Sequence, residues 1–234
     1  MKENEAISLK NKHAIVVGAS SGLGEALAVQ LIEQGAEVTA FSRKIETNSS
    51  LSKAFKVNCD ITDATDIGIA FYEVDKRNLP IDFLINVAGI GLMKKLEDTT
   101  SKEIENVLST NLKGIILTTQ EAYRRMKHQG FGRIINVSST SGFKPRALEP
   151  VYSASKFGLK GFTESMKLAG VEDGIDVIGV YPGGMNTKTF WKDQPDKDLS
   201  EYMEPSFVAG KIVELMKTPS QDLPNELVIE RPQH

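Results

Sequence analysis

Residues 13–24 read HAIVVGASSGLG, and this stretch determines the class of fold that the chain can form. Its first half, from His13 to Gly18, is a short apolar, β-branched run that ends in glycine, which is typical of a buried parallel strand. A helical spacing of apolar residues follows to Gln34, Gly35 closes that helix, and residues 36–42 read as a second strand. We therefore predict a βαβ unit with parallel strands and a right-handed crossover.

The same alternation continues to the end of the chain. Further strands are predicted at residues 54–58, 81–87, 133–138, 175–180 and 226–229. Further helices are predicted to run to about residue 78, over about 101–129, through Tyr152 to about residue 170, and over about 205–217. Thr62 or Asp63 is the predicted N-cap of the second helix. Residues 45–53 leave little room for a full helix, and residues 185–204 form an acidic, irregular stretch. We predict one α/β domain over residues 1–234, with a doubly wound parallel sheet of the Rossmann type.

Composition excludes several classes of protein. The formal net charge of −3 gives no basic surplus for nucleic acid or an anionic membrane, and nowhere do 18 apolar residues run together. Cys59 is the only cysteine, so no internal disulfide forms, and a reducing, cytoplasmic location fits. The three histidines, His13, His128 and His234, have no metal-ligand spacing, so we expect no metal.

The glycine-rich turn at residues 18–24 is a candidate dinucleotide site. Gly18 allows a tight turn out of the strand, and Gly22 and Gly24 let the backbone approach a pyrophosphate at the start of the helix. The alternative is a loop that only turns the chain. Its position between a strand and a helix favours nucleotide binding.

The second strand ends at Ser42 and Arg43. Many dinucleotide folds place an acidic residue here to bind the ribose hydroxyls of NAD. An aspartate would repel the 2′-phosphate of NADP, whereas a guanidinium can bind it with two hydrogen bonds. We therefore predict NADP(H) as the cofactor; the alternative is a solvated basic turn.

A tyrosine and a lysine four residues apart, Tyr152 and Lys156, lie one turn apart on a predicted helix. A nearby ammonium group is expected to lower the pKa of the phenol, and the pair could then transfer a proton near neutral pH. Taken alone, the spacing is more typical of a surface helix with an amphipathic tyrosine and a solvated lysine. The candidate groups elsewhere support the catalytic interpretation, because they follow predicted strands and so meet at one edge of the sheet. They are the 18–24 turn, Arg43, Asp60, residues 86–89, Ser138 with Ser139, and residues 182–187.

Together these residues resemble the short-chain dehydrogenase/reductase family, in its compact single-domain form. The resemblance extends from Leu9 to the last strand. It implies a catalytic tetrad of Asn111, Ser139, Tyr152 and Lys156; Ser139 precedes Tyr152 at the family's spacing, and Ser138 is the less favoured serine. It assigns to the cofactor Gly18, Ser20, Ser21, Gly22, Leu23, Gly24, Ser42, Arg43, Asp60, Ile61, Asn86, Ala88, Gly89, Tyr152, Lys156, Pro182, Gly183 and Thr187.

The resemblance has departures too. Ser21 stands where NADP-preferring members often carry a basic residue, so NADP preference depends on Arg43, with Lys44 beside it. The tail lacks the glycine-rich ending of many tetrameric members. The family commonly forms a four-helix contact between subunits, which implies a homodimer.

The expected activity is hydride transfer between NADPH and a small carbonyl compound, with Tyr152 as the proton donor. An apolar ketone or aldehyde is indicated by the candidate pocket residues Gly91, Leu92, Met93, Phe143, Leu148, Met185, Phe190 and Trp191; alternatively these side chains pack on one another or at a subunit interface. A second hypothesis is a non-catalytic NADP(H) sensor. Such a protein would need the glycine turn and Arg43 but not the tetrad.

Overall fold

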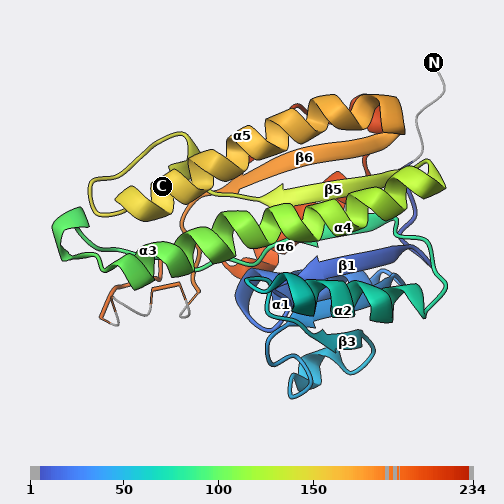
Figure 1. The fold of residues 1–234 in the computed structure, drawn as a ribbon, viewed down its shortest axis with the longest axis horizontal. Coiled ribbons are helices and arrows are strands. Elements are labelled where there is room, and N and C mark those ends of the chain that lie inside the picture. Colours follow the sequence, from blue (N-terminus) through green and yellow to red (C-terminus); the bar gives the residue numbers. More distant parts are fainter. Residues whose placement is uncertain (1–5, 188–189, 192–193, 195, 232–234) are drawn as a thin grey trace.

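The computed structural model describes residues 6–187, 190–191, 194 and 196–231, and a seven-stranded parallel sheet forms its centre (Figure 1). His234, for which we expect no metal-binding role, lies outside these residues. The strands are β1 (His13–Val17), β2 (Glu37–Ser42), β3 (Phe55–Asn58), β4 (Phe83–Asn86), β5 (Gly132–Val137), β6 (Ile175–Pro182) and β7 (Leu227–Ile229). All seven predicted strands are present, and their ends differ from the prediction by at most two residues.

The strand order is β3-β2-β1-β4-β5-β6-β7. The chain runs outward from β1 to β3 and then returns to place β4 on the other side of β1. The connections therefore diverge between β1 and β4, which opens a crevice at the carboxyl ends of these strands. In Figure 1 the arrowheads of the strands point to the left side of the molecule, where this crevice lies.

Helices cover both faces of the sheet because the strands are apolar on both faces. On β1, Ala14 and Val16 belong to the core under α1 (Gly22–Glu33) and α6 (Pro205–Lys217). Ile15 and Val17 belong to the core under α2 (Ala64–Asp75), α4 (Gly114–Gln129) and α5 (Pro150–Asp173). Figure 1 shows these two layers, with α2, α4 and α5 in front of the sheet. The alternation of side chains along a strand separates the two cores.

The long helical stretch at residues 101–129 has an interruption that bears on the site. It consists of α3 (Ser101–Leu108), a π-helical segment (Ser109–Lys113) and α4. Such π-helical insertions often occur at functional positions because they rotate one side chain relative to the rest of the helix. Here the segment contains Asn111.

Other local predictions are also confirmed. Asp63 is the N-cap of α2, and its carboxylate accepts a hydrogen bond from the Thr65 amide at 2.7 Å. Residues 45–53 contain only the short 3-10 helix η1 (Ser49–Leu51). Among the described residues, no helix is both long and apolar enough to cross a lipid bilayer.

Candidate active site

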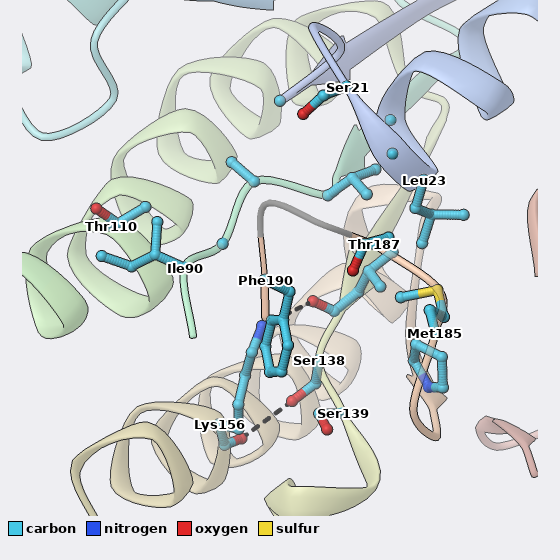
Figure 2. A pocket seen from close by; sticks show the side chains of 18 of the residues that line it. Ser21, Leu23, Ile90, Thr110, Ser138, Ser139, Lys156, Met185, Thr187 and Phe190 are labelled. Carbon is cyan, nitrogen blue, oxygen red and sulfur yellow. Dashed lines mark hydrogen bonds between the residues drawn. The ribbon is translucent and has the colours of Figure 1, made fainter. Parts of the chain in front are cut away.

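One cavity of about 280 Å³ lies at the carboxyl ends of the strands. Segments at the ends of six of the strands meet in its wall: residues 18–24 at β1, 42–43 at β2, 59–62 at β3, 87–90 at β4, 137–141 at β5 and 182–187 at β6. Figure 2 shows Ser21, Ile90, Ser139 and Thr187, each from a different segment, around the same space. Their convergence follows from the parallel topology, since all these strands end on one edge.

The glycine turn shows where a side chain is excluded. Gly18 has a φ of +94°, and a Cβ on it would lie 2.7 Å from the Ala88 backbone. A Cβ on Gly24 would overlap the Gly18 carbonyl, so this glycine lets α1 pack closely against the turn. Gly22 opens α1 and faces Thr187. The missing Cβ of Gly24 serves helix packing, and because Gly24 also lines the cavity, its expected place beside a pyrophosphate stays a prediction.

The start of α1 is suited to an anion. Ser21 is the N-cap residue, yet its side chain makes no capping hydrogen bond, so the first amides of α1 keep their capacity to donate. The helix dipole adds a partial positive charge at this position. Because Ser20, Ser21 and Leu23 line the cavity, a phosphate group held there would meet these amides.

The end of β2 combines a cation with a hydroxyl pair. Ser42 Oγ donates to Ser20 Oγ at 2.8 Å, and the exposed Arg43 follows at the cavity wall. Asp60 lies nearby, and its Oδ1 accepts hydrogen bonds from the Thr62 amide and hydroxyl at 3.0 and 2.8 Å. Burial raises the pKa of Asp60, but the Thr62 hydrogen bonds and the charge of Arg43 outweigh this and leave the pKa below its ordinary value. Asp60 is thus an anion next to Arg43.

Asn86, which we assign from the sequence to the cofactor, is fully buried outside the cavity wall. Its amide nitrogen donates to Thr119 and Asn136, and its oxygen accepts from Thr118. All of its hydrogen-bonding groups are therefore used to join β4 to β5 and α4, and we assign Asn86 a structural role. The residues after it, Val87, Ala88 and Gly89, do line the cavity.

The catalytic candidates on α5 are buried. Burial raises the pKa of the Tyr152 phenol, while a hydrogen bond with Ser139 acts in the opposite direction. Lys156 Nζ lies 5.8 Å from the centre of the Tyr152 ring, and burial lowers the pKa of Lys156 to about 8. The net shift of the Tyr152 pKa is upward because desolvation of the phenolate outweighs the Ser139 hydrogen bond, and the lowering that we expect from Lys156 stays a prediction. Tyr152 keeps its proton at neutral pH, as a proton donor must.

The structure distinguishes the two serines after β5. Ser138 Oγ donates to the backbone carbonyl of Lys156 at 3.2 Å, a bond drawn in Figure 2, so Ser138 fastens α5 to the sheet. Ser139 instead hydrogen-bonds Tyr152. The side chain of Lys156 extends into the cavity in the same view, and its Nζ donates to the Val137 carbonyl at 3.3 Å. These contacts favour Ser139 over Ser138 as the catalytic serine.

Asn111 lies behind the cavity wall. Its oxygen accepts from the Ile90 amide at 2.8 Å, and its nitrogen donates to the Ile90 carbonyl at 2.9 Å and to Ser155 Oγ at 3.2 Å. A Cβ on Gly89 would lie 3.5 Å from both Asn111 Oδ1 and Lys156 Nζ. Asn111 therefore anchors the Gly89–Ile90 loop, which lies between Asn111 and Lys156.

The candidate substrate residues divide into three groups. Met185, Phe190 and Trp191 line the main cavity, and the Phe190 ring packs edge-on against Tyr152 at 5.3 Å. Met93 and Leu148 line a second cavity of about 240 Å³, which shares Arg146, Glu149 and Trp191 with the first. Phe143 lines neither, because its ring packs against Tyr181 at 5.1 Å. Gly91 packs against Phe190, and Leu92 is buried with Val107 and Val151.

Several cavity residues were missed by the sequence reasoning. Glu149 and Arg146 reach the wall from the turn before α5, and Ser141 from the 3-10 helix η4 (Thr140–Gly142). Glu149 precedes Tyr152 by three residues, so helical spacing was an available signal for it. Ile90 and Thr110 carried no comparable signal.

Comparison with known proteins relates the whole chain to oxidoreductases. A family described as short chain dehydrogenase matches residues 12–198. Carbonyl reductase family member 4 of Danio rerio is 32% identical over 220 residues, which cover 88% of this chain and 91% of the relative. An uncharacterized oxidoreductase of Staphylococcus epidermidis is 29% identical over 226 residues, which cover 94% and 97%.

Solved structures agree with these relatives. A dehydrogenase/reductase from Sinorhizobium meliloti superposes with a TM-score of 0.84 at 28% identity, over 96% of each chain. A variant of actinorhodin polyketide ketoreductase, crystallised with NADPH, has a TM-score of 0.84 at 26% identity, over 94% of this chain and 95% of that one.

Proposed function

The chain belongs to the short-chain dehydrogenase/reductase family, and we propose that it is an NADPH-dependent reductase of small apolar ketones or aldehydes. The observation that supports this most is the position of Ser139, Tyr152 and Lys156 in one cavity with the glycine turn. The family assignment gives oxidoreductase chemistry. The choice of cofactor and of substrate is our proposal.

The residues at the cavity wall fit a dinucleotide. At Gly18 a Cβ would collide with the neighbouring backbone, and the uncapped amides at the start of α1 suit a pyrophosphate. Arg43 would hold the 2′-phosphate, and Asp60 would contact the adenine. When bound, NADPH supplies the hydride, and the protein orients the reacting groups.

The protein's own groups would handle the proton. Tyr152 would donate its phenolic proton to the carbonyl oxygen of the substrate, and the Ser139 hydroxyl would donate a hydrogen bond to the same oxygen. Lys156, with a pKa of about 8, is mostly protonated at neutral pH and stabilises the phenolate left after the transfer. Asn111 would support proton supply by holding the Ile90 loop beside Lys156. Phe190, Trp191 and Met185 would form the apolar side of the pocket.

The test is the loss of NADPH absorbance with a panel of ketones and aldehydes. We expect Tyr152→Phe to lower turnover by about two to four orders of magnitude, the range that a positioned acid contributes. NADPH binding, followed by fluorescence, should remain. Tyr72→Phe on α2 is the matched control, since Tyr72 is exposed at the surface. Near-normal turnover by Tyr152→Phe would refute its role, and NADPH binding without reduction of any carbonyl would favour the sensor hypothesis.

We also propose a homodimer. α5 carries exposed apolar side chains at Phe157, Leu168 and Val171, and burying them against a second copy would be favourable. A monomer mass by light scattering at micromolar concentration would contradict this. With Cys59 the only cysteine, we place the enzyme in the cytoplasm.

A further inference from the structure

A buried carboxylate, Glu149, lies beside the catalytic residues and has no part in the mechanism proposed above. It immediately precedes α5, is only 4% exposed and lines the main cavity. Burying a charge is costly unless it is paired and hydrogen-bonded. The cost of burying the Glu149 carboxylate must therefore be offset by a role in the fold or in the reaction.

Both oxygens of Glu149 have partners within the protein. Oε2 accepts a hydrogen bond from Ser141 Oγ at 2.8 Å, and Oε1 lies 3.6 Å from Arg146 Nη1. Arg146 is half exposed, so this ion pair is partly screened, whereas the Ser141 hydrogen bond is buried. The carboxylate thus joins the start of α5 to the turn after β5.

That turn carries the catalytic serine. The Ser141 amide donates to Ser139 Oγ at 3.1 Å, and Ser139 is the N-cap residue of η4. Ser139 in turn hydrogen-bonds Tyr152. Four residues from two elements therefore form one chain: Glu149, Ser141, Ser139 and Tyr152. Since Ser139 Oγ already accepts from an amide, its own hydrogen is left to donate toward Tyr152 or a substrate oxygen.

We propose that Glu149 is a positioning residue, which acts through Ser141 to hold the Ser139 hydroxyl in the orientation that the reaction requires. The proposal rests on the reductase function proposed above. It adds a specific role for the turn before α5, and it assigns Ser141 as the connecting group.

The charge of Glu149 has a second, measurable effect. The charged groups that act on Tyr152 are Glu149, which raises the pKa of its phenol, and Arg146, which lowers it. Lys156 lies on the same helix. Lys197 lines the second cavity together with Glu149. Removing the charge of Glu149 should therefore lower the pKa of Tyr152, whereas removing only its hydrogen bond should not.

Three variants separate these effects. Ser141→Ala removes the connection and keeps the charge, Glu149→Gln removes the charge and keeps an acceptor for Ser141, and Glu149→Ala removes both. Glu172→Gln is the matched control, because Glu172 is exposed near the other end of α5. The measurements are kcat, KM and the pH dependence of kcat for a ketone reduced by the unchanged enzyme, together with NADPH affinity.

We expect Ser141→Ala and Glu149→Ala to lower kcat about 10- to 100-fold, the scale for a misplaced reacting group, with NADPH affinity nearly unchanged. Glu149→Gln should lose less activity, and the fall of kcat at high pH should begin at lower pH than in the unchanged enzyme. Wild-type kcat and pH profile in all three variants, or losses that follow only the fraction of folded protein, would overturn the proposal. If the unchanged protein reduces no carbonyl compound, the proposed reductase function is refuted, and the positioning role of Glu149, which depends on it, is refuted as well.

Discussion

The cofactor preference of this enzyme is proposed to depend on Arg43, and the double variant Ser42→Asp with Arg43→Ala should reverse it. In the structure Arg43 lines the cavity directly after β2, and Ser42 Oγ donates to Ser20 Oγ at 2.8 Å. An aspartate at position 42 could accept a hydrogen bond from Ser20 and so keep this contact. It would also offer the ribose hydroxyls of NADH an acceptor and repel a 2′-phosphate.

The exposure of Arg43 determines how large a preference for NADPH over NADH we expect. A charge-assisted hydrogen bond contributes about 1.5–3 kcal/mol. Because Arg43 is exposed, water and salt weaken the interaction, and the lower value applies. About 1.5 kcal/mol corresponds to roughly a tenfold preference for NADPH over NADH in kcat/KM. Loss of the guanidinium together with repulsion by the new carboxylate should change the ratio by about a hundredfold, enough to invert it.

The assay compares kcat/KM for NADPH and NADH with one ketone, at low and high salt. Lys44→Ala is the matched control, since Lys44 is an adjacent exposed cation that is absent from the cavity wall. The preference of the unchanged enzyme should shrink in high salt as the exposed charge is screened. Equal use of both cofactors by the unchanged enzyme, or an unchanged preference in the double variant, would refute the role of Arg43.

Two further predictions concern the stability of the fold and its pH dependence. Gly24→Ala should lower the free energy of unfolding in urea by roughly 1–3 kcal/mol, because the new Cβ meets the Gly18 carbonyl. In the control Gly161→Ala a Cβ on α5 meets open space, so the free energy of unfolding should rise by about 0.5–1 kcal/mol; equal effects of the two substitutions would contradict the packing role of Gly24. Burial lowers the pKa of Lys156 from 10.5 to about 8, so between these values the unfolded chain binds a proton that the folded chain does not, and stability should rise with pH. Lys156→Met should therefore be more stable than the unchanged protein at pH 7 without nucleotide, and this advantage should shrink between about pH 8 and 10.5; a pH-independent difference would show that Lys156 is not desolvated.

Local patterns in the sequence were enough to predict the fold. Short β-branched runs between helical spacings identified all seven strands, because parallel strands buried on both faces must be apolar throughout. Once the strands are parallel and doubly wound, their carboxyl ends share one edge, so the meeting of Gly18, Arg43, Ser139 and Pro182 in one cavity followed from topology alone.

What only the tertiary structure decided was the direction of individual side chains and the effect of their surroundings. Asn86 at the end of β4 turns into a buried network, and Phe143 after η4 packs on Tyr181, although both lie close in the chain to residues that line the cavity. The Tyr152 pKa is raised because burial desolvates the phenol, an effect that the spacing of residues in the chain does not report. Glu149 is connected to Ser139 through Ser141 only because the turn after β5 folds back onto the start of α5. Periodicity reports which face of an element is buried, whereas hydrogen bonds, desolvation and charge depend on groups that are distant in the chain and meet only after folding.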